Sequence, residues 1–171
     1  MYVDSGLTYS GAPATTITGL SHLEGQTVKV LGDGIVQADK TVASGQITIT
    51  SASKVQVGLG YTHKYKSLKF PVGNPAGTGV GQIKRIDHIT YIMLESYTFE
   101  HGLDRSDVET VDYTRDANPD AWTAGTLFTG ERYTPFPGKY QRDSRIYIES
   151  DEPLPWTLLA IAPEMKTNPK L

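Results

Sequence analysis

The sequence between residues 21 and 61 alternates apolar and polar side chains in short runs separated by small, turn-forming residues. Val28 and Val30 lie on one side of such a run, and Ile47 and Ile49 repeat the pattern. An alternation with a period of two is typical of a β-strand with one buried face. We therefore expect a small antiparallel sheet of four strands. Its turns are expected at residues 32–34, 44–45 and 51–53, where glycine and serine recur.

Strand signals continue through the rest of the chain at short intervals, without helical segments between them. The predicted fold class is all-β, an antiparallel β-sandwich or barrel with a smaller β-meander sub-domain. The glycine-rich run VGNPAGTGVG at residues 72–81 is the expected boundary or crossing between sub-domains. The expected organisation is a strand at 1–13 packing on the second sub-domain, a small sub-domain at 14–60, a sandwich at 61–165 and a flexible tail at 166–171.

The longest apolar run of the second half covers residues 85–99, RIDHITYIMLESYTF. A helix is one interpretation, since several of its apolar residues lie three or four positions apart. Its isoleucine, threonine and tyrosine content and the absence of helix caps favour a long central strand. Apolar residues on both sides of the alternation predict a strand buried on both faces over its middle.

The composition restricts the classes of partner. The net charge of −3 does not favour nucleic-acid binding through bulk electrostatics. Cysteine is absent, which excludes disulfides and thiolate metal sites. No apolar run approaches the roughly 18 residues needed to cross a bilayer, so no membrane partner is expected. No cofactor is expected either.

The residues suited to catalysis or metal binding are scattered. The four histidines, at positions 22, 63, 88 and 101, do not share metal-ligand spacing on one element. Glycines precede Lys84 without the spacing of a phosphate-binding loop. No Gly-x-Ser-x-Gly motif occurs, and no nucleophile and base can be paired. We therefore predict no enzyme, no catalytic residue and no small-molecule substrate.

Two sets of acidic residues are candidates for chemistry. Asp104, Asp107 and Glu109 lie close together in LDRSDVE, but without the spacing of an EF-hand, so a solvated charged turn is the favoured interpretation. Paired carboxylates could also serve glycoside cleavage, because their separation is set by the fold rather than by the sequence. The pool for that chemistry is Asp116, Asp120, Glu131 and Asp151.

An aromatic, proline-broken passage in the last third of the chain is the candidate interface. Exposed aromatic side chains can bury in a partner subunit or stack on sugars, whereas buried ones would close the open end of a sandwich. Interface and plug are equally favoured here, and both are preferred to a sugar site. The candidate residues are Trp122, Phe128, Tyr133, Phe136 and Tyr140.

Several motifs resemble a module of tail proteins from tailed bacteriophages and prophages. They are HLEGQTVKVLGDG, VASGQITI and SKVQVGLGY in the first third, and LFTGE, PFPGKY and EPLPWTLLAIAP in the last. The chain is similar over most of its length to the C-terminal β module of tubular, nozzle or hub "stabilisation" proteins of short-tailed phages. These motifs are turns and strands, so the resemblance carries over no site residue.

The resemblance implies a non-enzymatic structural role in a virion tail, exercised through contacts with other tail proteins and with copies of the chain in a ring. Rigid folded units that bury edges and aromatic surface against neighbours suit such a machine. The alternative is a carbohydrate- or receptor-binding module at the tail tip, and an enzyme acting on the bacterial envelope comes third. Because Met1 directly precedes YVDSGLTYSG, we also expect the sequence to be a C-terminal fragment of a longer protein.

Overall fold

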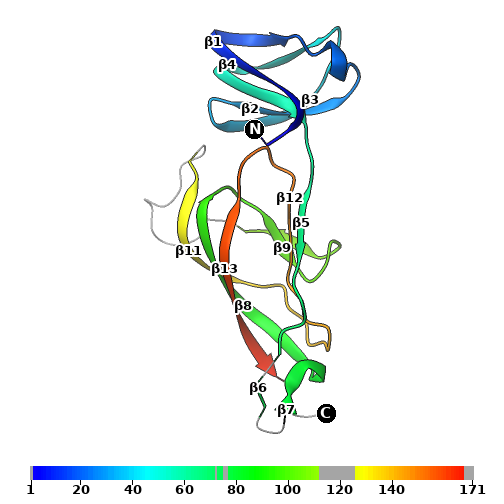
Figure 1. The fold of residues 1–171 in the computed structure, drawn as a ribbon, viewed down its shortest axis with the longest axis vertical. Helices are drawn as coiled ribbons and strands as arrows, with labels where there is room; N and C mark the ends of the chain where they lie inside the picture. The colour runs from blue at the N-terminus through cyan, green and yellow to red at the C-terminus, as the bar shows by residue number, and fades with distance from the viewer. Residues whose placement is uncertain (1, 72, 75–76, 112–125, 168–171) are drawn as a thin grey trace. The chain divides into compact units, whose positions relative to one another are not determined.

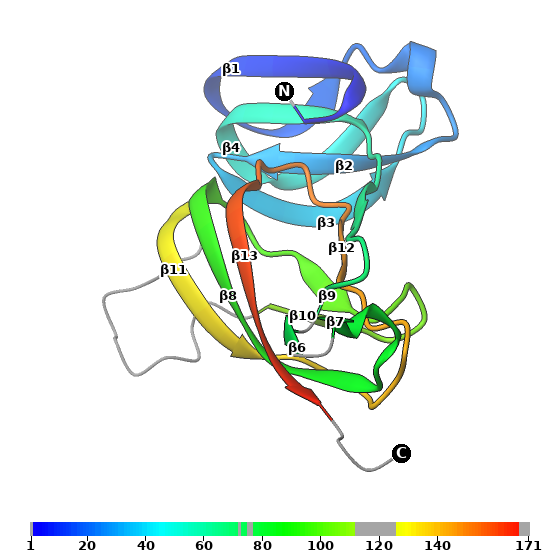
Figure 2. The same ribbon diagram turned by 60° about the horizontal axis from the view of Figure 1, so that its bottom comes forward.

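The computed structural model describes residues 2–71, 73–74, 77–111 and 126–167. Over these ranges the chain forms β-strands, two single turns of 3-10 helix and loops, and no α-helix. The strand ladders described there are all antiparallel. The chain divides into two compact units, whose strands Figures 1 and 2 show. Of the described residues, 2–62, 126 and 151–155 belong to the first unit, and 63–111, 127–150 and 156–167 to the second.

The first unit is a single four-stranded sheet in the order β1-β4-β2-β3. Its strands are β1 (Asp4–Thr18), β2 (Thr27–Gly32), β3 (Ile35–Thr41) and β4 (Gln46–Leu59), and the 3-10 turn η1 (Ser21–Leu23) links β1 to β2. Alternating apolar residues of these strands lie on one side and make the core, as the period of two predicts. The buried members are Ile17, Leu20, Leu23, Val28, Val30, Val42, Ile47, Ile49, Ala52, Val55 and Val57.

Two tight turns of this unit fall where the sequence predicts them. Asp33 and Gly34 have φ values of 51° and 83°, and they join β2 to β3 as a two-residue hairpin turn. The Asp33 carboxylate accepts hydrogen bonds from the backbone N–H groups of Ser53, at 3.0 Å, and Lys54, at 2.8 Å. Those bonds lower the pKa of Asp33 below its usual 3.8. The predicted turn at residues 44–45 also forms, again with positive φ at both positions.

Two expectations about the first unit are wrong. The turn expected at residues 51–53 is absent, because β4 continues through them as one strand that pairs with β1 and with β2. The first thirteen residues, expected to pack on the second sub-domain, instead begin β1, in which Leu7 pairs with Val57. The pairing of β1 with β4 shifts register after Ser10, in the segment that contains Gly11 and Pro13, and the strand continues beyond it.

The second unit is an antiparallel sandwich of two open sheets, not a closed barrel. One sheet has the order β10-β9-β12-β5, and the other has the order β11-β8-β13, with β8 in the centre. Buried residues from both sheets share one core. The strands are β5 (His63–Lys66), β6 (Gly73–Asn74), β7 (Gly77–Thr78), β8 (Lys84–Ser96), β9 (Glu100–Gly102), β10 (Val108–Thr110), β11 (Phe128–Pro135), β12 (Tyr147–Ser150) and β13 (Thr157–Thr167), with the 3-10 turn η2 (Gly79–Gly81) before β8.

The central strand β8 confirms the strand interpretation of residues 85–99 but corrects its burial. Tyr91 and Met93 are buried in the core, whereas Leu94 on the other face is 42% exposed. The other face of β8 has no second layer among the described residues, so the expectation of burial on both faces is wrong. The apolar residues on that face remain available to solvent.

The division between the units falls between Thr62 and His63, within two residues of the expected division between residues 60 and 61. The glycine-rich residues 72–81 are not this boundary, because their described members lie within the second unit. Lys84, after those glycines, is buried, and its ammonium donates to the carbonyl of Val80 at 3.1 Å. Burial lowers the pKa of Lys84. The expected tail at 166–171 begins too early, because β13 includes Lys166 and Thr167.

A polar chain crosses the core of the second unit. The Tyr91 hydroxyl lies 2.9 Å from Nδ1 of His101, and Nε2 of His101 lies 3.3 Å from the Glu109 carboxylate. The His101 side chain is 1% exposed, and the rings of Tyr91 and Phe136 both contact it. Burial lowers the pKa of His101 below 6.5, and the Glu109 carboxylate opposes this effect in part. The folded state therefore favours the neutral imidazole.

We expect the second unit to lose stability as the pH falls below about 6.5. With a lowered folded-state pKa, the unfolded chain binds a proton at His101 first, so stability falls until the folded state is protonated as well. One proton limits the slope to about 1.4 kcal/mol per pH unit. Urea unfolding between pH 8 and pH 5 measures it, and His101→Gln should flatten the profile. A profile unchanged by that substitution, but altered by His22→Gln at an exposed site, would contradict the assignment.

Candidate interaction surface on the three-stranded sheet

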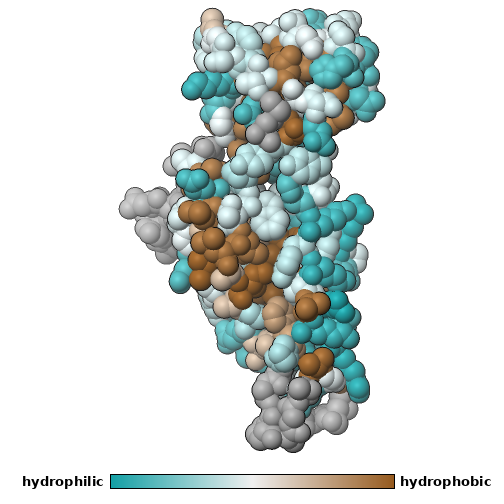
Figure 3. Space-filling model, viewed as in Figure 1, coloured by the Kyte–Doolittle hydropathy of each residue, from teal (hydrophilic) through white to brown (hydrophobic). Residues whose placement is uncertain are grey.

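The outer face of the β11-β8-β13 sheet carries the largest apolar side chains that this sheet leaves exposed. Leu94 of β8 is on it, since its neighbour Met93 faces the core. Ala160 pairs with Ile92, and paired residues share a face. Leu159 stands at a register shift beside them and is 60% exposed. Figure 3 shows hydrophobic residues gathered over the middle of this unit, where Figure 1 draws β8 and β13.

The other end of the same face is polar and aromatic. His88 stacks on Tyr133, with ring centroids 4.8 Å apart and planes at 7°. The Tyr133 hydroxyl donates to Glu164 at 3.0 Å, and Glu164 pairs with His88 across the strands. Next to this group, Asp87 accepts hydrogen bonds from Arg85 and Lys166, which hold its pKa below the usual value. The sheet thus presents an apolar end and an end rich in hydrogen-bonding groups.

The five predicted interface residues do not behave as one set. Tyr133 and Tyr140 are 52% and 50% exposed, and the Tyr140 ring lies 5.6 Å from the Arg85 guanidinium. Phe136 is 6% exposed and belongs to the core, and the partly buried Phe128 packs against that core. Trp122 lies outside the described residues. Phe136 is therefore a core residue, whereas Tyr133 and Tyr140 remain candidates for an interface.

The acidic turn and the histidines form no shared metal-binding group in the part of the chain that the structure describes. Asp104 accepts bonds from the backbone and hydroxyl of Ser106, which lower its pKa. Asp107 accepts from Lys139 at 2.8 Å, and Glu109 faces His101. Each of these carboxylates thus has a partner of its own, as a charged turn would. In the carboxylate pool, Glu131 and Asp151 belong to different units, and Asp116 and Asp120 lie outside the described ranges.

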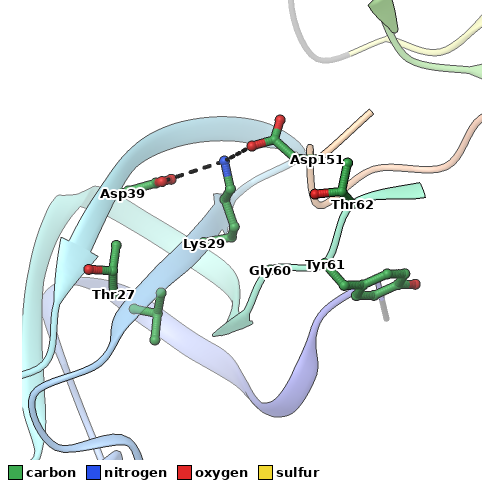
Figure 4. Close-up of a pocket in the computed structure, with 8 residues that line it drawn as sticks. Thr27, Lys29, Asp39, Gly60, Tyr61, Thr62 and Asp151 are labelled. Carbon is green, nitrogen blue, oxygen red and sulfur yellow. Dashed lines mark hydrogen bonds and ion pairs between the residues drawn. The ribbon is translucent and has the colours of Figure 1, made fainter. Parts of the chain in front are cut away.

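A small polar cavity of about 170 Å³ lies in the first unit (Figure 4). The Lys29 ammonium is 3.1 Å from the Asp151 carboxylate and 3.5 Å from that of Asp39. Burial opposes the charge on Lys29, but the two carboxylates outweigh it and raise its pKa. The cavity is below the roughly 300 Å³ at which small-molecule sites begin, and its one ammonium is already held between two carboxylates. We assign it a structural role.

Comparison with known proteins gives no family. No protein-family model matches the chain, and no curated protein matches it either. In the described ranges, no helix has the length and apolar character required to cross a membrane.

Sequence reasoning missed the outer face of the three-stranded sheet. The residues were visible, because Ile92 and Leu94 alternate with Tyr91 and Met93. The sequence does not show whether a second layer covers each face of this sheet. Both sets of alternating apolar residues were therefore assigned to the core. The uncharged run that begins at Thr157 was interpreted simply as a last strand, although an apolar edge strand is an interaction signal when nothing covers it.

Proposed function

We propose that this chain is a non-enzymatic structural component of a phage or prophage tail. It would be made in the bacterial cytoplasm, carried in the virion, and held in the tail by contacts with other tail proteins and with copies of itself. The observation that supports an assembly role is the exposed apolar end of the three-stranded sheet around Leu94 and Leu159. Contiguous apolar surface of this kind marks interaction sites, and burying a leucine fully is worth about 1.5–3 kcal/mol. The tail as the setting comes from the resemblance of the sequence motifs.

Four charged residues of the described chain make ion pairs that suit a structural role. Lys29, Asp87, Asp107 and Asp143 are each held by an oppositely charged side chain. A β module with an exposed apolar face is suited to assembly.

The test is incorporation into particles. A tagged chain, expressed in the bacterium that encodes it, should be present in tails purified after induction and be visible there by immuno-electron microscopy. We expect Leu94→Asp to reduce its incorporation at least about tenfold, because every 1.4 kcal/mol lost from a contact weakens it about tenfold. Its stability should change by no more than about 0.5 kcal/mol, as the site is exposed.

Leu68→Asp is the matched control. Leu68 is 84% exposed and lies after β5, outside the three-stranded sheet, and the substitution makes the same change in charge and size. It should leave incorporation unchanged. Absence of the parent chain from purified particles would overturn the proposed function, and equal incorporation of both variants would overturn the role of the apolar face.

The polar end of the same face favours one second candidate, a carbohydrate- or receptor-binding module at the tail tip. Tyr133 is stacked on His88 and is still 52% exposed, and Glu164 beside it could accept hydrogen bonds from hydroxyl groups. Sugar rings stack on aromatic faces flanked by such polar groups. Binding of the chain to host-surface glycans, abolished by Tyr133→Ala and retained in Leu94→Asp, would favour this candidate over assembly.

A further inference from the structure

The outermost strand β13 has a free edge. It pairs with β8 along one side, from Thr157 opposite Leu94 to Thr167 opposite Lys84. Along the other side, the described residues provide no strand partner, and Figures 1 and 2 both draw β13 at the margin of its sheet. No residue of this strand is fully buried. The backbone N–H and C=O groups of such an edge are available for pairing with another chain.

The first part of this edge lacks the charges that four other edge strands of the chain carry. The first seven residues of β13, Thr157–Pro163, contain no charge, and Leu159 and Ala160 are exposed. Charges, prolines and bulges are the usual devices that prevent edges from pairing. Four of the other edges carry charges: Glu131 in β11, Lys64 and Lys66 in β5, Glu109 in β10, and Asp39 and Lys40 in β3. The edges of β1 and β13 have instead a proline and register shifts, with Pro13 in β1, and with Pro163 and a shift at Leu159 in β13.

We propose that the free edge of β13 pairs antiparallel with the same strand of a second copy of this chain. The inference rests on the proposed assembly role and specifies one contact of it. A strand pairing with its own copy needs a segment that opposes no like charges, and the seven uncharged residues meet that condition. With the pair centred on Ala160, Thr157 of each copy lies opposite Pro163 of the other, and Glu164 lies opposite Trp156, just before the strand. The contact would bury Leu159 of both copies beside the joined apolar faces.

The symmetry of this contact limits what it can build. Two antiparallel copies of one strand are related by a two-fold axis, so the contact is complete with two copies. A ring of subunits would need a second, heterologous contact elsewhere, for which the apolar surface around Leu94 remains available. The edge and the face meet at Leu159, so the face is tested by substitution of Leu94 and the edge by the association of the purified chain.

Analytical ultracentrifugation of the purified chain tests the edge contact. Between about 1 and about 100 µM, a range that covers transient protein contacts, we expect the mass to rise from one copy to two. Leu159→Lys combined with Ala160→Lys should weaken this association at least about tenfold, because two lysines at an edge oppose their counterparts in the other copy. Circular dichroism should show that the double variant keeps the β fold.

Two further measurements locate the contact. Leu68→Lys, the single change that adds a lysine at an exposed leucine outside the sheet, should dimerise like the parent chain. Amide hydrogen exchange in β13 should slow at the higher concentration. A chain that stays monomeric across the range, a double variant that dimerises as tightly as the parent, open-ended aggregates, or slowed exchange confined to other strands would each overturn the inference. Loss of the dimer with normal incorporation into tails would overturn this contact alone, whereas absence from tails would overturn the proposed function and leave the dimer measurable.

Discussion

The Phe136→Ala variant is expected to lose about 3–5 kcal/mol of its free energy of unfolding, the range for a buried aromatic side chain replaced by alanine. Phe136 is 6% exposed and its ring meets the His101 ring edge-on, with centroids 5.2 Å apart. Its backbone N–H also donates to the Asp87 carbonyl at 3.0 Å, which fixes the chain after β11. Removing the ring would leave a cavity beside the buried His101 imidazole.

The matched control is Tyr140→Ala, four residues further along the same loop. Tyr140 is half exposed, and the contact of its ring with Arg85 at 5.6 Å is worth about 0.5–1 kcal/mol at an exposed site. Urea unfolding separates the two variants, and Trp156, stacked near Phe99 in the same core, is one fluorescence reporter. Equal losses for Phe136→Ala and Tyr140→Ala would mean that the loop after β11 is part of the core at both positions, and Tyr140 would cease to be an interface candidate.

The aromatic residues of the candidate interface could not be divided into exposed and buried members from the sequence. Phe128, Tyr133, Phe136 and Tyr140 all lie in one proline-broken passage, and nothing in their spacing distinguishes interface from core. β11 separates them by alternation, because Arg132 and Thr134 are buried and Tyr133 is exposed. Phe136 follows the end of that strand. Its burial therefore depends on the path of the loop and not on the alternation of side chains along the strand.

Local signals explain why so much of the fold could be predicted. The alternation at Val28 and Val30 and the turns at residues 33–34 and 44–45 are properties of neighbouring residues, and they form as expected. These local signals do not determine which strands pair when the strands are far apart in the sequence. The contact of Leu7 with Val57 joins residues fifty positions apart, which is why the first strand was assigned to the wrong unit.

The same reasoning applies to the candidate surface. A stripe of isoleucine and leucine on β8 predicts burial unless the number of layers is known, and the sequence does not carry that number. The residues that make the surface were therefore identified as apolar strand residues but assigned to the core. Tyr133 and Tyr140 are exposed and stay candidates for an interface, because an aromatic residue in a proline-broken segment can lie on a surface loop as well as in the core.

The Gly102→Ala variant is expected to be destabilised by about 1–3 kcal/mol or more, the cost of forcing extra volume into a packed region. A Cβ at Gly102 would lie 1.9 Å from the Asp107 carbonyl oxygen and 3.0 Å from the Val108 Cα. These are backbone atoms, so no side-chain rotation can relieve the overlap. Gly102 pairs with Val108 on one side and with Tyr147 on the other, so β9 cannot shift without disturbing both ladders.

Gly81→Ala provides the control, because a Cβ there would meet nothing within 4 Å. Its free energy of unfolding should stay within about 0.5 kcal/mol of the parent chain, as for most exposed substitutions. Urea unfolding measures both variants, and hydrogen exchange should show early opening of β9 and β10 in Gly102→Ala. A stable Gly102→Ala variant would mean that the turn carrying Asp104 and Asp107 can move away from β9 at little cost. The ion pair of Asp107 with Lys139, at 2.8 Å, would then be the contact that adjusts, and its loss should appear as a reduced salt dependence of stability.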